Sequence, residues 1–301
     1  MKEIMVEDSL ERLEQREEDQ EKIASLEQKL TQQRRNAAAQ QKRLRSEMAK
    51  IESKAASSSF DASEVDQSKI FYIEVTDFKV SYQGKVDDLD VAWSGTGFLL
   101  EDGRFVTARH VIQAWHFLSE GASKGMIAAN VLEQLGGSVD VTFRAKSPDG
   151  TTMNFKSTQF KWDDSDDVDM EAVLKGKTYN CKVAQLPDAK DWAYFKSGKP
   201  SKMPVNATAS TQLKQGINVA VFGYSYRIGS SGTPTPLYSS SVVGFDGTRD
   251  GVIYLTNRNF GQGNSGGPAF VKNGGRYEVI GIVSAGTGAE IGILIPIGAL
   301  R

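Results

Sequence analysis

The chain has 301 residues, of which 39% are hydrophobic and 25% charged, enough for a sizeable core and, by length, about two domains. Its formal net charge of −2 argues against a protein built mainly to bind nucleic acid, and no apolar run is long enough to span a bilayer. The single cysteine, Cys181, excludes an intramolecular disulfide and fits a reducing, cytoplasmic compartment, although an anchor upstream of Met1 would change that compartment.

Residues 1–55 are predicted to be helical, because they contain no glycine, proline or aromatic residue and are rich in good helix formers. Apolar side chains at heptad spacing favour an interrupted coiled coil; they are Ile23, Leu26, Leu30, Ala37, Leu44 and Ile51. Residues 1–27 carry ten acidic and four basic side chains, whereas residues 28–50 carry one acidic and seven basic. This asymmetry favours an antiparallel partner, either a second copy of the chain or another protein. A solvated single helix is the alternative.

Beyond a linker at residues 56–69, the apolar pattern changes to the period of two that is typical of strands. Short strands are expected at 70–75 and 78–80, a helix at 122–135, and a hairpin formed by 138–146 and 151–161. The segment from 122 to 161 is either a lid or recognition loop over the site, or decoration.

One of the two histidines stands in a distinctive setting. His110 follows two short apolar strands that turn at Asp102-Gly103, within the stretch GTGFLLEDGRFVTARHV. His116, six residues on, lacks such a frame, and we expect it to be a surface residue. Histidine is the usual base that activates a serine hydroxyl, so His110 is the candidate base.

The stretch GQGNSGGP at residues 261–268 places Ser265 between glycines and before a proline, as in a tight exposed turn. Gly266 and Gly267 are expected to permit unusual backbone conformations and the close approach of a substrate. The N–H groups of Gly263 and Ser265 could stabilise an oxyanion.

Together, GTGFLL, DGRFVTARHV and GNSGGP resemble the trypsin-like serine peptidases, most closely the bacterial HtrA-type branch, over roughly residues 70–301. The resemblance implies an all-β, chymotrypsin-like fold of two six-stranded β-barrels, about 70–196 and about 205–301, behind the helical segment. It also implies hydrolysis of peptide bonds in protein or peptide substrates, with no metal and no cofactor.

In such peptidases an aspartate lies between the histidine and the serine along the chain. Asp191, in DWAYFK, matches the family pattern of an aspartate followed by apolar residues entering a strand. It would orient His110 and stabilise the imidazolium. Asp169, at the end of the acidic run from Asp163, is the alternative, although such a run is more often a solvated loop.

The C-terminal segment resembles the substrate-binding part of the family. The strand containing Ser284, Ala285 and Gly286 would pair with the substrate backbone, and Ser284 would also support the aspartate. Gly286 and Gly292 match two walls of the primary specificity pocket, with Asn259 at its base. Because Asn259 is neutral and neither histidine is placed to supply a cation, we expect an uncharged substrate side chain of medium to large size.

Asn264 stands where digestive trypsins have an aspartate that pairs with a newly cleaved N-terminus. We therefore expect activity without cleavage at the start of the domain, with control by assembly, a partner or loop ordering. No PDZ-like domain is expected after the peptidase domain. Two rival functions remain: a catalytically silent, protease-fold binding module recruited through its N-terminal helix, and a dedicated protease that cleaves one partner.

Overall fold

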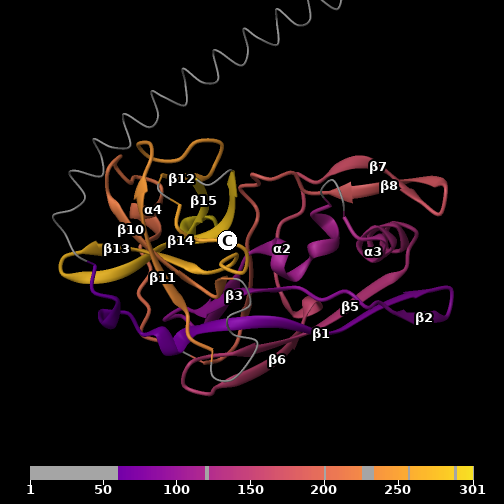
Figure 1. Ribbon diagram of the computed structural model, residues 1–301, viewed down its shortest axis with the longest axis horizontal. Helices are drawn as coiled ribbons and strands as arrows, with labels where there is room; N and C mark the ends of the chain where they lie inside the picture. The colour runs from indigo at the N-terminus through magenta and orange to yellow at the C-terminus, as the bar shows by residue number, and fades with distance from the viewer. Residues whose placement is uncertain are drawn as a thin grey trace, which may run out of the picture. The chain divides into compact units, whose positions relative to one another are not determined.

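The described part of the chain consists mainly of β-strands in two successive sheets, which Figure 1 shows side by side. The computed structural model describes residues 60–118, 122–199, 201–225, 234–256, 258–287 and 290–300, all within one compact unit, Ala55–Arg301. The predicted helix at residues 1–55 lies outside the described residues. The all-β, chymotrypsin-like class is confirmed.

The N-terminal sheet has seven strands in the order β6-β5-β1-β3-β4-β9, with β2 paired to β1. They are β1 (Ile70–Tyr82), β2 (Lys85–Asp88), β3 (Ser94–Leu99), β4 (Arg104–Thr107), β5 (Ser138–Lys146), β6 (Thr152–Lys156) and β9 (Ala193–Lys196). The two strands expected at 70–80 are one, β1, with an irregularity between Val75 and Asp77.

This sheet curls, but it differs from the expected six-stranded barrel. Beyond β6, Lys161 pairs with Tyr194 of β9 through two backbone hydrogen bonds of 2.7 and 3.1 Å. This isolated bridge joins the two ends of the strand order where a full ladder would close a barrel. Phenylalanine rings with centroids 4.8 to 6.4 Å apart pack at this junction; they are Phe105, Phe155, Phe160 and Phe195.

The C-terminal sheet is a closed barrel in the order β10-β11-β12-β15-β14-β13. Its strands are β10 (Asn218–Gly223), β11 (Leu237–Val243), β12 (Ile253–Thr256), β13 (Pro268–Asn273), β14 (Arg276–Thr287) and β15 (Ile291–Pro296). The barrel interior is filled by branched aliphatic side chains that are at most 1% exposed, among them Val221, Ile253, Leu255, Ile280 and Leu294. Alternating side chains from each strand point inward and build this core.

The helices are short and lie between or beside the strands along the chain. They are α2 (Arg109–Ile112), α3 (Lys124–Gln134), α4 (Ala207–Ser210) and the 3₁₀ turns η1 (Ala62–Glu64), η2 (Gln67–Lys69), η3 (Ala114–His116), η4 (Ser157–Gln159) and η6 (Ile297–Ala299). The helix expected at 122–135 is confirmed as α3, whose N-terminus is capped by the Ser123 hydroxyl. No helix in the described ranges is long and apolar enough to cross a membrane.

Besides the short helices, the chain between β4 and β9 forms two hairpins. The predicted β5–β6 hairpin is confirmed, but β5 pairs with β1 along most of its length, so this hairpin belongs to the sheet and is not a lid. The second hairpin, β7 (Val168–Leu174) with β8 (Lys177–Val183), was not predicted. Figure 1 shows it beside α3, and Val131 of α3 packs on Cys181 of β8, which is fully buried.

Within the stretch expected as a linker, the described residues from Phe60 onward pack on the barrel. The Phe60 ring lies 4.9 Å from that of Tyr238 and 4.1 Å from that of Tyr277, centroid to centroid. Val65 is buried in the hydrophobic core cluster that also contains Tyr277. The chain therefore enters the first sheet through an ordered contact with the second.

Candidate active site

His110 and Asp191 meet where β4 ends and β9 begins. Asp191 is fully buried, whereas 19% of the His110 side chain is exposed. Oδ2 of Asp191 lies 2.8 Å from Nδ1 of His110, and its Oδ1 accepts the backbone N–H of His110 at 2.9 Å. A carboxylate bonded to Nδ1 favours the tautomer with its proton there, which leaves Nε2 as the basic atom.

Two serines from the barrel complete a chain of hydrogen bonds to this pair. The Ser284 hydroxyl, on β14, donates to Oδ2 of Asp191. The Ser265 hydroxyl, just before β13, donates to the carbonyl oxygen of Ser284 at 3.4 Å. The structure thus brings His110, Asp191, Ser265 and Ser284 together. Asp169 lies apart, exposed on β7 with its carboxylate 3.8 Å from Lys182.

Thr96 of β3 anchors the loop that carries Ser265. Its hydroxyl donates to the carbonyl oxygen of Gly263 at 2.7 Å, and its backbone N–H donates to the carbonyl oxygen of Ser265 at 2.8 Å. The same hydroxyl accepts the N–H of Tyr224 at 3.0 Å, and Thr96 is fully buried. One threonine therefore joins the first sheet to the loop and to the end of β10.

The glycines after Ser265 are required by close contacts, those of Gly266 with the first sheet and those of Gly267 with β10 of the barrel. Gly266 has φ +82°, and a Cβ there would lie 2.1 Å from the carbonyl oxygen of Thr96 and 2.2 Å from Oγ1 of Thr107. A Cβ on Gly267 would lie 2.2 Å from the carbonyl oxygen of Phe222. We expected these two glycines to let a substrate come close. The atoms that come close to them are instead those of the protein itself.

The loop leaves two backbone donors unused. Gly263 has φ +95°, and neither its N–H nor that of Ser265 donates a hydrogen bond to any residue in the described ranges. Asn264, between them, is fully buried, and its Oδ1 accepts the hydroxyl of Ser225 at 2.6 Å. Its Nδ2 has no hydrogen-bond partner within the described part of the chain.

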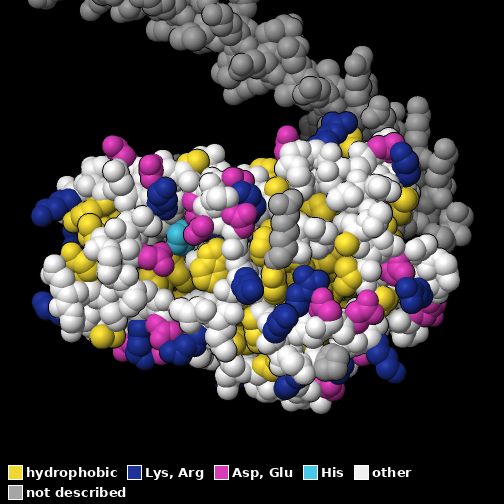
Figure 2. Space-filling model, turned by 180° about the vertical axis from the view of Figure 1, so that it is seen from behind, with side chains coloured by type: hydrophobic (Ala, Val, Ile, Leu, Met, Phe, Trp, Pro, Cys, Tyr) yellow, Lys and Arg dark blue, Asp and Glu magenta, His cyan; other side chains and the backbone are white. Residues whose placement is uncertain are grey.

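A cleft of about 520 Å³ adjoins the cluster. Its lining includes His110, Gly263 and Ser265, together with Trp93, Ala114, Phe117, Met126 and Gln262. Trp93 is fixed by a hydrogen bond of 2.8 Å from its indole N–H to the carbonyl oxygen of Val111. Figure 2 shows histidine at the surface of one face of the molecule, flanked by acidic and hydrophobic side chains.

The residues expected to form the specificity pocket lie beside an arginine that the prediction did not include. Asn259, expected at the pocket base, is exposed. Its neighbour Arg258 instead reaches Gly286, where a Cβ would lie 1.9 Å from Nη1 of the arginine. A Cβ on Gly292 would lie 2.5 Å from Cζ of Phe260. The sequence analysis did not single out Arg258, because the spacing from Ser265 pointed to the next position.

Comparison with known proteins identifies the family. The family model described as "Trypsin-like peptidase domain" matches residues 95–282, more than half of the chain. The chain belongs to the trypsin-like peptidase family. A comparison with curated protein sequences gives no significant match.

Solved structures similar to this trypsin-like peptidase have low sequence identity to it and TM-scores below 0.5. Deg5 is 18% identical with a TM-score of 0.40, over 77% of this chain and 85% of that one. A Glu endopeptidase is 15% identical with a TM-score of 0.45, over 81% and 92%. The protease Anisep from Arthrobacter nicotinovorans is 12% identical with a TM-score of 0.39, over 76% and 90%.

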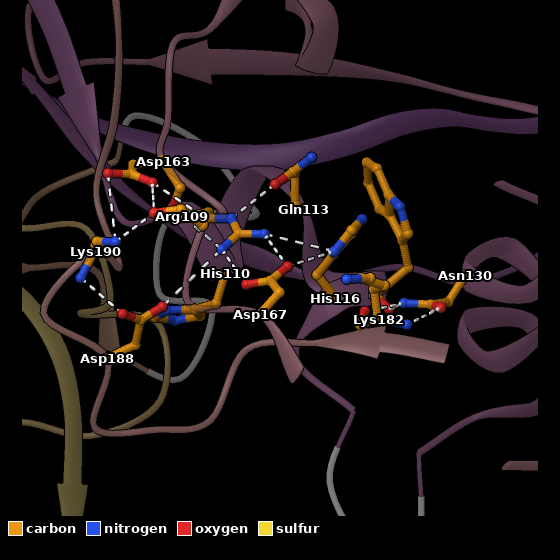
Figure 3. A network of polar contacts seen from close by, with 12 residues as sticks. Arg109, His110, Gln113, His116, Asn130, Asp163, Asp167, Lys182, Asp188 and Lys190 are labelled. Carbon is orange, nitrogen blue, oxygen red and sulfur yellow. Dashed lines mark hydrogen bonds and ion pairs between the residues drawn. The ribbon is translucent and has the colours of Figure 1, made fainter. Parts of the chain in front are cut away.

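Beside His110, the peptidase buries an arginine in a network of charges (Figure 3). Arg109 is fully buried, and its Nη1 and Nη2 donate to the two carboxylate oxygens of Asp167 at 2.7 and 2.6 Å. Its Nε donates to Gln113 at 2.8 Å, and Nη1 lies 4.0 Å from Oδ2 of Asp188. The bidentate pair fastens the loop before β7 to the helix that carries His110.

His116 belongs to this network, so the expectation of a surface histidine is wrong. It is 6% exposed; Nδ1 lies 3.0 Å from Oδ2 of Asp167, and Nε2 lies 2.7 Å from Oε2 of Glu133. Glu133, on α3, also accepts the indole N–H of Trp115 at 2.9 Å. The misassignment followed from reading local sequence alone, since the carboxylates come from segments 17 and 51 residues away.

The network shifts the pKa values of its members. Burial opposes protonation of His116, but hydrogen bonds to Asp167 and Glu133 outweigh it and raise the pKa of the imidazole. Burial likewise opposes ionisation of Asp167, yet Arg109 and His116 lower its pKa to about 2. Asp188, desolvated and near Asp191, has its pKa raised to about 6.

Proposed function

We propose that the chain is a serine endopeptidase in which Ser265 is the nucleophile, His110 the base and Asp191 the group that orients His110. The observation that carries the proposal is the double contact of Asp191 with His110, at Nδ1 and at the backbone N–H, beside a cleft that both His110 and Ser265 line. Membership of the trypsin-like peptidase family supports the same reaction.

In the proposed reaction, the Ser265 hydroxyl leaves the Ser284 carbonyl and turns towards Nε2 of His110. Oγ attacks the scissile carbonyl carbon while its proton moves to His110, and the tetrahedral intermediate carries its negative charge on the former carbonyl oxygen. The intermediate then collapses, the C–N bond breaks, and His110 gives the proton to the departing amine. Water repeats these steps on the acyl-enzyme and releases the acid.

The oxyanion is assigned to the N–H groups of Gly263 and Ser265. Both donors are unused within the described residues, so no existing hydrogen bond must break when the charge forms. The positive φ of Gly263 is one that glycine adopts at little cost.

The domain arrangement and its control belong to the same proposal. We assign residues 1–55 to a helical recruitment or self-association segment, 56–69 to a connection, and 70–301 to the peptidase domain. Asn264 is buried and held by Ser225, and its neutral side chain could not form an ion pair with an N-terminus released by zymogen cleavage. Assembly or a partner protein would then control activity.

Cleavage of an unstructured protein tests the proposal. Wild type, Ser265→Ala and Asp191→Asn are assayed side by side with the exposed-site variant Asp169→Asn as control. We expect both active-site variants to lose about 10⁴-fold or more in turnover and the control to match wild type. Equal cleavage by wild type and Ser265→Ala would defeat the proposal, and absence of cleavage with retained peptide binding would favour a silent binding module.

A further inference from the structure

We propose that Arg258 selects substrates with an acidic side chain on the residue whose carbonyl is attacked. The inference rests on the proposed function and adds its substrate class. It departs from the expectation of an uncharged side chain, because the structure provides a cation where the sequence pattern indicated a neutral asparagine.

Gly286 and Gly292 create a bare face on the barrel. They are direct partners across β14 and β15, so side chains at both positions would point to the same side of the sheet. That face is covered by Arg258 and Phe260, whose atoms lie 1.9 and 2.5 Å from where the two Cβ atoms would be. Phe260 is buried, whereas Arg258 is half-buried and reaches solvent.

The arginine is held in place by backbone contacts. Its Nε donates to the carbonyl oxygen of Phe260 at 2.8 Å, and its backbone N–H donates to the carbonyl oxygen of Glu290 at 3.4 Å. The guanidinium carbon lies 5.7 Å from the centroid of the Phe260 ring. The Nη1 end of the guanidinium is the part closest to Gly286.

This guanidinium lies next to the path proposed for the substrate. The Ser265 hydroxyl contacts the carbonyl oxygen of Ser284, and Gly286 is two residues further along β14. Two residues along a strand span about 7 Å, and the register of β14 against β15 shifts between Val283 and Ala285, just before Gly286. In the proposed complex, a peptide pairs with Ser284–Gly286 and presents its scissile carbonyl to Ser265. The side chain of the substrate residue that carries this carbonyl would then extend over Gly286, toward Arg258.

The chemistry of the face fits a carboxylate. Guanidinium groups bind carboxylates through charge-assisted, often bidentate hydrogen bonds. The Phe260 ring below offers an apolar surface for the methylene groups of such a side chain. An amide of the same shape would lose the charge–charge attraction, and a lysine would be repelled.

A peptide series tests the inference. The peptides differ only in the residue before the scissile bond, which is Glu, Asp, Gln, Leu or Lys, and kcat/KM is measured for each. We expect the better acidic peptide to exceed the Gln peptide by about 100-fold, the range of a hydrogen bond to a charged group. Arg258→Gln should bring that ratio to within about 3-fold, and Arg258→Glu should favour Lys. The matched control Arg276→Gln, at an exposed arginine on β14, should keep the wild-type ratio.

The outcomes separate this inference from the proposed function. Efficient cleavage without acidic preference, or faster cleavage of every peptide by Arg258→Gln, would mean that the arginine merely covers the pocket, and would overturn the inference alone. If no peptide is cleaved and diisopropyl fluorophosphate does not label Ser265, the proposed function fails and this inference fails with it.

Discussion

At the scale of single residues, the site depends on positions that carry no reactive group. Thr96 bonds to the backbone on both sides of Asn264, and Gly266 lets β3 and the Ser265 loop touch. Motif reading found Gly266 because glycine is conspicuous in a sequence. It did not find Thr96, because an isolated threonine in a strand carries no signal of its long-range bonds.

Replacing Gly266 by alanine should destabilise the fold. The new Cβ would overlap the Thr96 carbonyl oxygen at a positive φ, so we expect the free energy of unfolding to fall by about 3 kcal/mol and activity to fall with it. Gly103→Ala is the matched control, because Gly103 has the same φ of +82° but nothing within 4 Å of its Cβ position. Chemical denaturation measures both variants. Equal losses would show that backbone strain alone, and not contact between the sheets, decides the effect.

The buried histidine predicts a pH dependence of stability. Because the folded-state pKa of His116 is raised above the ordinary value of 6.5, its protonation stabilises the fold. That contribution is complete below pH 6.5 and is lost as the pH rises through the folded-state pKa. We expect the free energy of unfolding to decline over this interval in wild type and to decline less in His116→Gln. Identical pH profiles from denaturant titrations of the two proteins would contradict the assignment.

At the scale of elements, the segment between His110 and Asp191 is more than decoration. Its β5–β6 hairpin completes the sheet, and the loop before β7 supplies Asp167 to Arg109. Strand and helix patterns located β5, β6 and α3 from the sequence. The buried ion pair escaped prediction because Asp167 stands in a run of acids whose other members are mostly solvated.

Removing the Arg109–Asp167 pair should unfold the region around the active site. Asp167→Asn removes the bidentate carboxylate from a buried guanidinium and leaves it only Asp188, 4.0 Å away, as a counter-charge, so we expect a loss of about 3 kcal/mol in the free energy of unfolding. Asp169→Asn, two residues away and exposed, should change it by less than about 0.5 kcal/mol. Denaturant titration compares the two. A loss of similar size in both variants would mean that net charge, and not the buried pair, is responsible.

The cleft beside His110 predicts a second substrate preference. Its lining contains His110 and Gly263 but no residue of Ser284–Gly286, so under the proposed function it receives the residue after the scissile bond. Met126→Ala should lower kcat/KM about 10-fold for peptides with leucine directly after the scissile bond. It should lower kcat/KM little for peptides with glycine at that position. Leu135→Ala, an equivalent truncation at the exposed end of α3, serves as the control. An equal loss with both peptides would place the cleft outside the binding path.

At the scale of the whole molecule, residues from both sheets form the site, so that the proposed base and the proposed nucleophile meet only when the two sheets pack together. His110 and Asp191 come from the first sheet, and Ser265 and Ser284 come from the barrel. The resemblance supplied the order of these residues along the chain. Arg258 escaped it, since side-chain direction at a loop depends on contacts with Gly286 and Phe260 that spacing does not encode.

Labelling with a fluorophosphonate probe tests the central claim most directly, because the probe reacts only with an activated serine. Intact mass and peptide mapping should find one adduct, on Ser265, in wild type and none in Ser265→Ala, with the rate slowed about 10³-fold or more in His110→Ala. An adduct on another serine, or equal labelling rates for wild type and His110→Ala, would contradict the assignment of Ser265 and His110 as nucleophile and base.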